Sequence, residues 1–215
     1  MSQIDYLIPL VSIIVGLGLA DLIQSFRDLL RPNRAVRWHW LPVLWATVVF
    51  LLVLRIWWTA YDVLQQDAFG RVLVFLPYLL NFLVLFLACS FALPDSDWTP
   101  GPAAAGSGAE REPEHPAAPL NLEAFYFSAA HRRWFFGTLI VITVLFEVIT
   151  VVFFLAVEDA ALLTIVAGRW EALTIVPAAL VVPILTDRWW VHAPLAIVAV
   201  VAAVWNLVQA APIGG

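Results

Sequence analysis

The sequence is poor in charged side chains, which make up only 13% of its 215 residues, against about 25% in a soluble domain. Lysine is absent, so all 11 basic residues are arginines. With so few charges, nothing indicates a nucleic-acid partner. Hydrophobic residues reach 63% and the mean hydropathy is +0.91. These values predict an integral membrane protein whose solvent is the lipid bilayer.

Reactive residues and catalytic motifs are also scarce. The single cysteine, Cys89, excludes a disulfide framework within the chain and a cysteine-based zinc site. There is no HExxH motif and no pairing of serine with lysine or histidine on the apolar segments, so we expect no enzyme activity, no metal and no cofactor. The first residues, MSQIDY, lack the basic region of a signal peptide, so the first apolar run is expected to stay in the protein.

Long apolar runs take the place of these features. A membrane helix needs about 20 mostly apolar residues, and the runs at 5–28, 40–62, 72–93, 134–156, 170–186 and 189–210 meet or approach this length. They predict an all-α, polytopic membrane helix bundle of about six transmembrane helices in one domain, 1–215. The fifth run is the weakest, because Pro177 and Pro183 interrupt it. An apolar patch at 160–168 leaves open a re-entrant or surface-lying piece there.

The arginines predict the orientation of the bundle. Eight arginines fall in the first, third and fifth connections, and the other side has only Arg71 and Arg169. Both termini are therefore predicted outside the cytoplasm. Arginine and tryptophan together open the second, fourth and sixth runs, where they suit the lipid headgroup level. These interface anchors are Arg37, Trp38, Arg133, Trp134, Arg188 and Trp189.

The same three starts read RWHWLPVLW, RWFFGTLIV and RWWVHAPLA. A shared interface explains the similarity in the plainest way, because three helices that leave the same headgroup layer need the same anchors. The alternative is an architecture of three helical hairpins in one arrangement.

The connection between the third and fourth helices divides into two kinds of sequence. Residues 94–120 are rich in Pro, Ala, Gly and Glu without an apolar period, which predicts a flexible cytoplasmic loop. Residues 121–133 place apolar side chains at helical spacing ahead of two arginines. This segment is predicted to be amphipathic and to lie in the interface.

Small residues at four-residue spacing mark helix packing in lipid, where close backbone approach draws helices together. The first run has Ser12, Gly16 and Ala20, and the last has Ala199 and Ala203. We expect both helices to be closely packed, either within the chain or across a homo-oligomer interface.

Three of the predicted helices carry polar residues at helical spacing, which places each set on one helix face. These residues are Arg55, Thr59 and Asp62 in the second helix, Tyr78 and Asn81 in the third, and Thr143, Glu147 and Thr150 in the fourth. At about 1.5 Å per residue, Arg55 lies roughly 23 Å and Glu147 roughly 20 Å from the inner boundary. Asn81 lies roughly 14 Å from the outer boundary.

Arg55 needs a partner at this depth. A lone charge there costs at least about 2.5 to 3.5 kcal/mol, and a guanidinium cannot lose its proton. Glu147 is the deepest carboxylate, so we predict an ion pair between Arg55 and Glu147, with Asn81 close by. Asp62 is the alternative partner. Asp21, nearer the cytoplasmic surface, is expected to face headgroups and loop arginines.

This Arg-Glu-Asn cluster has two interpretations. It is either a buried ion pair that fixes helix register, or the centre of a conduit for an ion, a proton or a small solute. In the second case Glu147 exchanges a proton or cation beside the fixed charge of Arg55. The alternative function is that of a non-catalytic structural or accessory subunit in a larger membrane complex.

The stretch DYLIPLVSIIVGLGLADLIQSFRDLLR and the phrase HRRWFFG resemble an uncharacterised group of small bacterial multi-pass inner-membrane proteins. The resemblance covers most of the chain apart from residues 100–118. It implies a location in the bacterial inner membrane and brings no ligand or catalytic residue.

Overall fold

The computed structural model describes residues 4–32, 35–66, 69, 71–95, 98, 119–157 and 162–210. In this part of the chain the protein is an all-α bundle, as predicted. Its long helices are α1 (Ile4–Leu29), α2 (Trp40–Leu64), α3 (Val72–Ala92), α5 (Ala129–Val157), α6 (Leu162–Leu185) and α7 (Trp189–Ala210). All six are long and apolar enough to cross a bilayer, which makes the chain a multi-pass membrane protein.

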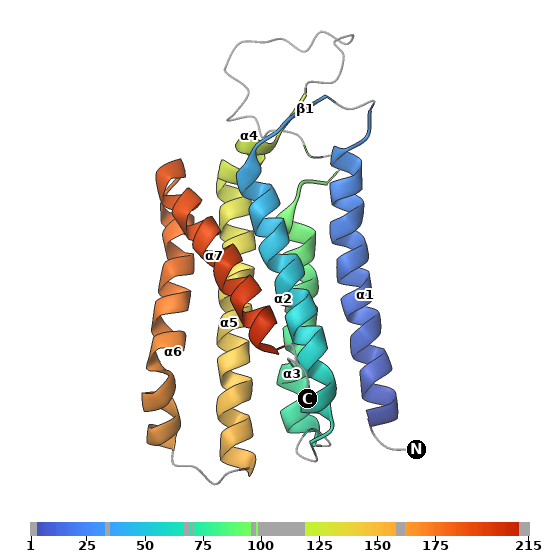
Figure 1. Cartoon of the computed structure of the whole chain (residues 1–215), viewed down its shortest axis with the longest axis vertical. Helices are drawn as coiled ribbons and strands as arrows, with labels where there is room; N and C mark the ends of the chain where they lie inside the picture. Colours follow the sequence, from blue (N-terminus) through green and yellow to red (C-terminus); the bar gives the residue numbers. More distant parts are fainter. Residues whose placement is uncertain are drawn as a thin grey trace.

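The helices α2, α3 and α5 form the centre of the bundle (Figure 1). α1 packs against α3 and α2, α6 packs against α5, and α7 crosses obliquely over α2. The chain thus runs through three successive helical hairpins, but these are packed differently. α3 and α5 lie in close contact, whereas α6 and α7 touch little.

One end of the bundle is covered by short elements, and we call it the capped end. Here β1 (Val36–Arg37) pairs in parallel with β2 (Leu120–Asn121), which joins two distant connections of the chain. The short helix α4 (Leu122–Phe127) follows β2 directly (Figure 1). The Asn121 side chain accepts hydrogen bonds from the first backbone amides of α4 and so caps this helix. The capped end is the end that the arginines predict to be cytoplasmic.

The segment predicted to be amphipathic, 121–133, is divided at Ser128, where α4 ends and α5 begins. The Ser128 hydroxyl accepts a hydrogen bond from the His131 backbone amide, which explains the early start of α5. Leu122 and Tyr126 are fully buried. The apolar face of this segment therefore packs against the bundle instead of lying in lipid. Most of the predicted flexible loop, 96–97 and 99–118, lies outside the described residues.

The weak fifth run is part of one continuous helix. α6 begins at Leu162 and passes through both Pro177 and Pro183. It therefore takes in the apolar patch at 160–168, apart from the first residues of that patch, which lie outside the described part of the chain. A membrane helix tolerates such prolines where neighbouring groups satisfy the freed carbonyls.

The close contact of α1 is made by a different small residue from those predicted. A Cβ added to Gly18 would lie 3.4 Å from Cys89 Sγ and 3.5 Å from Phe86 Cα, which is van der Waals contact, so Gly18 is the glycine of α1 that faces α3. Ser12 is half-buried, whereas Gly16 and Ala20 are exposed. On α7, Ala199 and Ala203 are half-buried on the helix that packs against α2.

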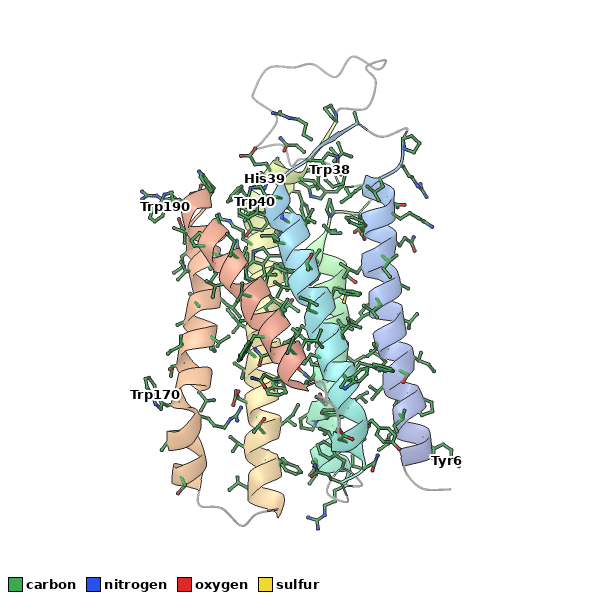
Figure 2. All side chains as sticks on the ribbon, viewed as in Figure 1. Tyr6, Trp38, His39, Trp40, Trp170 and Trp190 are labelled. Atoms are coloured by element: carbon green, nitrogen blue, oxygen red, sulfur yellow. The ribbon has the colours of Figure 1, made fainter. Side chains whose placement is uncertain are left out.

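Trp38, Trp40 and Trp190 lie at the capped end (Figure 2). Trp38, Trp134 and Trp189 are each more than half exposed. Arg37, Arg133 and Arg188 lie beside them with exposed side chains. The Arg188 guanidinium carbon is 5.9 Å from the ring centre of Trp190, a cation–π contact. Such a ring of indoles and arginines suits the headgroup layer of a membrane.

Candidate functional site

Glu147 of α5 forms an ion pair with Arg169 of α6. Arg169 Nε lies 2.7 Å from Glu147 Oε2, and Arg169 Nη2 lies 2.9 Å from Oε1. The guanidinium therefore uses two parallel donors and occupies both carboxylate oxygens. The Glu147 side chain is 6% exposed and that of Arg169 is 32% exposed, so the pair is partly shielded between the two helices.

The predicted ion pair between Arg55 and Glu147 is not formed, because the two side chains leave their helices in different directions. Glu147 points from α5 toward α6, whereas Arg55 belongs to α2. Arg169 was placed in a connection by the sequence. It lies inside a helix because α6 begins at Leu162. Arg169 follows seven residues later and is therefore about 10 Å from the start of α6.

Arg55 contacts an aromatic ring instead of a carboxylate. Its guanidinium carbon is 5.7 Å from the ring centre of Phe146, the residue before Glu147. The depth predicted for Arg55 therefore agrees with that of Glu147. Arg55 Nε is buried without a hydrogen-bond partner, and the ion pairs found among the described residues do not include Arg55. Asp62, the alternative partner, is exposed.

Asn81 of α3 is a further buried polar side chain in this part of the bundle. It is 1% exposed, and neither its Nδ2 nor its Oδ1 has a hydrogen-bond partner. Tyr78, one turn away, is 6% exposed and packs edge-on against Phe69 and Phe82 at ring distances of 5.2 and 5.1 Å. Buried amides without partners are rare in folded proteins and require an explanation.

The threonines on the predicted polar faces bond within their own helices. Thr59, Thr143 and Thr150 each donate a hydroxyl proton to a backbone carbonyl one turn earlier, at distances of 2.8–3.2 Å. This local bond satisfies the hydroxyl donor without a partner on another helix. The structure thus brings Arg55 to the level of Glu147, but it leaves the threonines outside any shared cluster.

A buried network at the capped end was not predicted from the sequence. The Tyr126 hydroxyl lies 2.8 Å from His192 Nδ1, and His192 Nε2 lies 2.9 Å from the Thr186 carbonyl oxygen. Because a carbonyl only accepts, Nε2 carries the imidazole proton and Nδ1 accepts from the tyrosine. Burial raises the pKa of the Tyr126 phenol, and the nearby positive charge of Arg132 offsets part of this rise. The network ties α4 to α7.

His131 lies close to this network, with its ring centre 5.7 Å from that of Tyr126. It is 7% exposed, and its ring centre is 4.3 Å from that of Phe125 and 5.2 Å from that of Phe135. His131 Nε2 and two nitrogens of Arg132 are buried without hydrogen-bond partners. The start of α5 therefore carries donors and acceptors that the protein itself does not satisfy.

Asp21 was expected to face headgroups and loop arginines, but it faces another helix. The Ser90 hydroxyl of α3 donates a hydrogen bond to Asp21 Oδ2. Asp28, two turns further along α1, pairs with Arg27 and Arg31. The chain therefore directs one carboxylate of α1 toward α3 and another to the arginines at and just after the end of α1.

Among the residues that the structure describes, no group of three histidine, cysteine or acidic side chains could hold a metal ion. Comparison of the chain with protein-family models, with curated proteins and with solved structures found no match. The resemblance to small bacterial membrane proteins therefore stays a prediction.

Proposed function

We propose that this integral membrane protein is a conduit for a small anion or a neutral solute with hydrogen-bond acceptors, and that Arg55 is its binding group. The observation that carries the proposal is the half-buried guanidinium of Arg55, whose Nε has no hydrogen-bond partner and which forms no ion pair among the described residues. It cannot lose its charge. The contact with Phe146 contributes about 0.5–2 kcal/mol, less than the cost of at least about 2.5 kcal/mol for a lone charge at this depth. Water or a solute supplies the difference.

Asn81 supports the same proposal. Arg55 lies nine residues before the end of α2, and Asn81 lies nine residues after the start of α3. Both are therefore about 14 Å from the end of the bundle opposite the capped end. A buried amide without partners adds further donors and an acceptor at the level of the guanidinium.

The pairing of Glu147 argues for an anion or a neutral solute over a proton. Both oxygens of its carboxylate accept hydrogen bonds from Arg169. A carboxylate whose two oxygens both accept from one guanidinium is engaged in an ion pair and is not free to bind a passing proton or cation. Glu147 therefore has a structural role in this proposal, which also includes no catalytic step.

Flux measurements on purified protein in liposomes test the proposal. Vesicles loaded with chloride, nitrate or phosphate are expected to release an anion faster than empty liposomes, with saturation at high concentration. Arg55→Leu should remove this release. Arg71→Leu, which changes an exposed arginine at the start of α3, should leave it intact. Release that is equal in the Arg55 variant and the native protein would contradict the proposed site.

We place the chain in the bacterial inner membrane with both termini outside the cytoplasm. The unequal distribution of arginines supports this orientation, and six spans bring both ends of the chain to the same side. Fusion of a reporter that is active only outside the cytoplasm to either terminus tests this orientation. Activity of a fusion at the Arg37 connection would contradict it.

The second candidate function is that of an accessory subunit or a homo-oligomer. Gly16 of α1 is exposed, and a Cβ placed there would meet no atom within 4 Å. The small-residue face of α1 is therefore left open for a helix of another chain. Cross-linking of intact membranes tests this function. Gly16→Leu should reduce any cross-linked complex. A change at Gly18, which contacts α3 within the same chain, serves as the comparison.

A further inference from the structure

Arg132 lies at the capped end, where α4, the start of α5 and the start of α7 meet. Phe136 follows Arg132 by one turn and therefore lies on the same face of α5. The ring centre of Phe136 is 6.1 Å from that of His192 of α7. This face of α5 thus brings Arg132 toward the start of α7, one turn nearer the capped surface. The positive charge of Arg132 accordingly acts on both Tyr126 and His192.

The guanidinium of Arg132 has donors that the protein does not satisfy. Nε and Nη1, which carry most of its N–H groups, are buried without hydrogen-bond partners. Arg132 is also absent from the ion pairs found among the described residues. A guanidinium cannot lose its charge, and charged donors without partners are unfavourable. An anion with several acceptor oxygens is the group that fits these donors.

Arg188 supplies a second guanidinium near the same place. The His192 backbone amide donates a hydrogen bond to the Arg188 carbonyl oxygen, so Arg188 lies one turn before His192 and nearer the capped surface. The Arg188 side chain is exposed, over the ring of Trp190 at the capped end (Figure 2). The carboxylate of Asp187 is exposed and takes part in none of the ion pairs of the described residues. Two arginines without an ion-paired carboxylate favour a negatively charged ligand.

The surroundings of these arginines indicate which anion they bind. Trp189 and Trp190 are 60% and 59% exposed and belong to the ring of indoles at the level of the lipid headgroups. Phosphate esters are the anions of this layer, and the planar guanidinium matches a phosphate with paired hydrogen bonds. Basic sites between membrane helices on the cytoplasmic side bind anionic headgroups in the same way.

We infer that Arg132 and Arg188 bind one phosphate ester between the starts of α5 and α7. Arg132 supplies the inner donors, and the exposed side chain of Arg188 turns to contact the outer oxygens. The site differs from the exposed interface anchors, which meet any lipid, because its inner guanidinium is partly buried beside the Tyr126–His192 network. The ligand chemistry is shared by the headgroup of an anionic phospholipid and by a dissolved phosphate compound at the capped end.

Native mass spectrometry of the full-length protein, purified from bilayers with equal amounts of phosphatidylglycerol and phosphatidylcholine, tests the lipid source. The native protein is expected to retain phosphatidylglycerol. Arg132→Gln should weaken this binding by about tenfold or more, as for loss of charged hydrogen bonds. Arg188→Gln should weaken it less, because an exposed charge is screened by water. Arg133→Gln, which removes the exposed charge of the next residue, is the matched control and should leave the binding unchanged.

Thermal unfolding in detergent, with sodium phosphate compared with sodium chloride at equal ionic strength, tests the dissolved source. A rise of the midpoint in phosphate that is lost with Arg132→Gln identifies a dissolved phosphate compound. Retention of phosphatidylglycerol without this rise identifies a lipid headgroup. Arg55→Leu should show the same phosphate effect as the native protein, which separates this site from the proposed conduit. None of these readouts depends on solute flux.

Equal retention of both lipids, together with no effect of phosphate, would overturn the site. An Arg132→Gln variant that keeps the native lipid preference or the native phosphate effect would overturn it as well. If Arg132→Gln does not fold, Arg132→Lys takes its place, since lysine keeps the charge but lacks the planar fork and should bind more weakly. Native binding by both Arg132→Lys and Arg188→Gln would then contradict the inference.

Discussion

Arg169 and Arg55 approach α5 from different neighbouring helices and contact consecutive residues of it. Arg169, from α6, binds the carboxylate of Glu147 through two hydrogen bonds. Arg55, from α2, lies over the ring of Phe146 and has no ion pair in the described part of the chain. The two arginines are alike in type and close in depth. They differ in the residue of α5 that each contacts: Glu147 for Arg169 and Phe146, the residue before it, for Arg55.

This difference in pairing indicates that the two arginines have different roles, one in the structure of the bundle and one in binding. A paired guanidinium holds α6, which otherwise contacts little besides α5, to the centre of the bundle. An unpaired guanidinium leaves binding capacity unused by the protein itself. The first arginine is therefore expected to affect folding, and the second is expected to affect what the bundle binds.

The largest effect is expected from Glu147→Leu, which leaves Arg169 without its carboxylate. We expect the free energy of unfolding to fall by roughly 3 kcal/mol, at the lower end of the range for a broken buried pair because Arg169 is partly exposed. Unfolding of the purified protein in detergent measures this loss. Thr143→Val, one turn away on the same helix, is the control and should cost much less.

A second change should repair part of this loss. Glu147→Leu together with Arg169→Leu removes both charges, so the double variant should be more stable than Glu147→Leu alone. If the double variant were less stable by the sum of both single losses, the ion pair would contribute nothing specific.

Asn81→Leu should raise the free energy of unfolding by about 1–2 kcal/mol, since it replaces a buried amide without partners by an apolar side chain of similar size. The same variant should slow anion release if Asn81 contributes to the conduit. Thermal unfolding in detergent and vesicle flux give the two readouts. A destabilised protein would show that Asn81 binds a group inside the bundle.

Tyr126→Phe should lower the free energy of unfolding by about 1 kcal/mol, because it removes the hydrogen bond to His192 and leaves the ring packing intact. Tyr61→Phe changes an exposed tyrosine at the other end of α2 and serves as the control. Equal stability of both variants would show that the capped-end network does not join α4 to α7 energetically.

Arg55→Leu should have the smallest effect on folding. The free energy of unfolding should change by less than about 1 kcal/mol, since the variant loses a cation–π contact and leaves no carboxylate unpaired. Its effect on anion release should be large. A strongly destabilised Arg55 variant would indicate a structural partner for this arginine.

Hydropathy and helical rise were sufficient to predict the membrane helices and the depth of Arg55, because both depend on position along the chain. The partner of Glu147 depends on the direction in which each side chain leaves its helix and on the start of α6, and neither is fixed by hydropathy. If the sequence had predicted the start of this helix at Leu162, Arg169 would have been predicted inside the bundle. The connected residues Tyr126 and His192 are 66 positions apart, and no local spacing joins them.

Gly18 illustrates the same limit at the level of packing. The spacing of Ser12, Gly16 and Ala20 indicated a packing face on α1, but the glycine that faces α3, Gly18, is offset from Gly16 by half a turn. Small residues show that a helix can be approached closely, and only the position of the neighbouring helix decides at which residue.

Double-mutant cycles on two pairs that share Glu147 test the difference between the arginines most directly. The free energies of unfolding of the single and double leucine variants are measured for Glu147 with Arg169 and for Glu147 with Arg55. The first cycle should give a coupling energy of at least about 1.5 kcal/mol, and the second should stay within about 0.5 kcal/mol of additivity. Strong coupling between Glu147 and Arg55, with none between Glu147 and Arg169, would contradict the account.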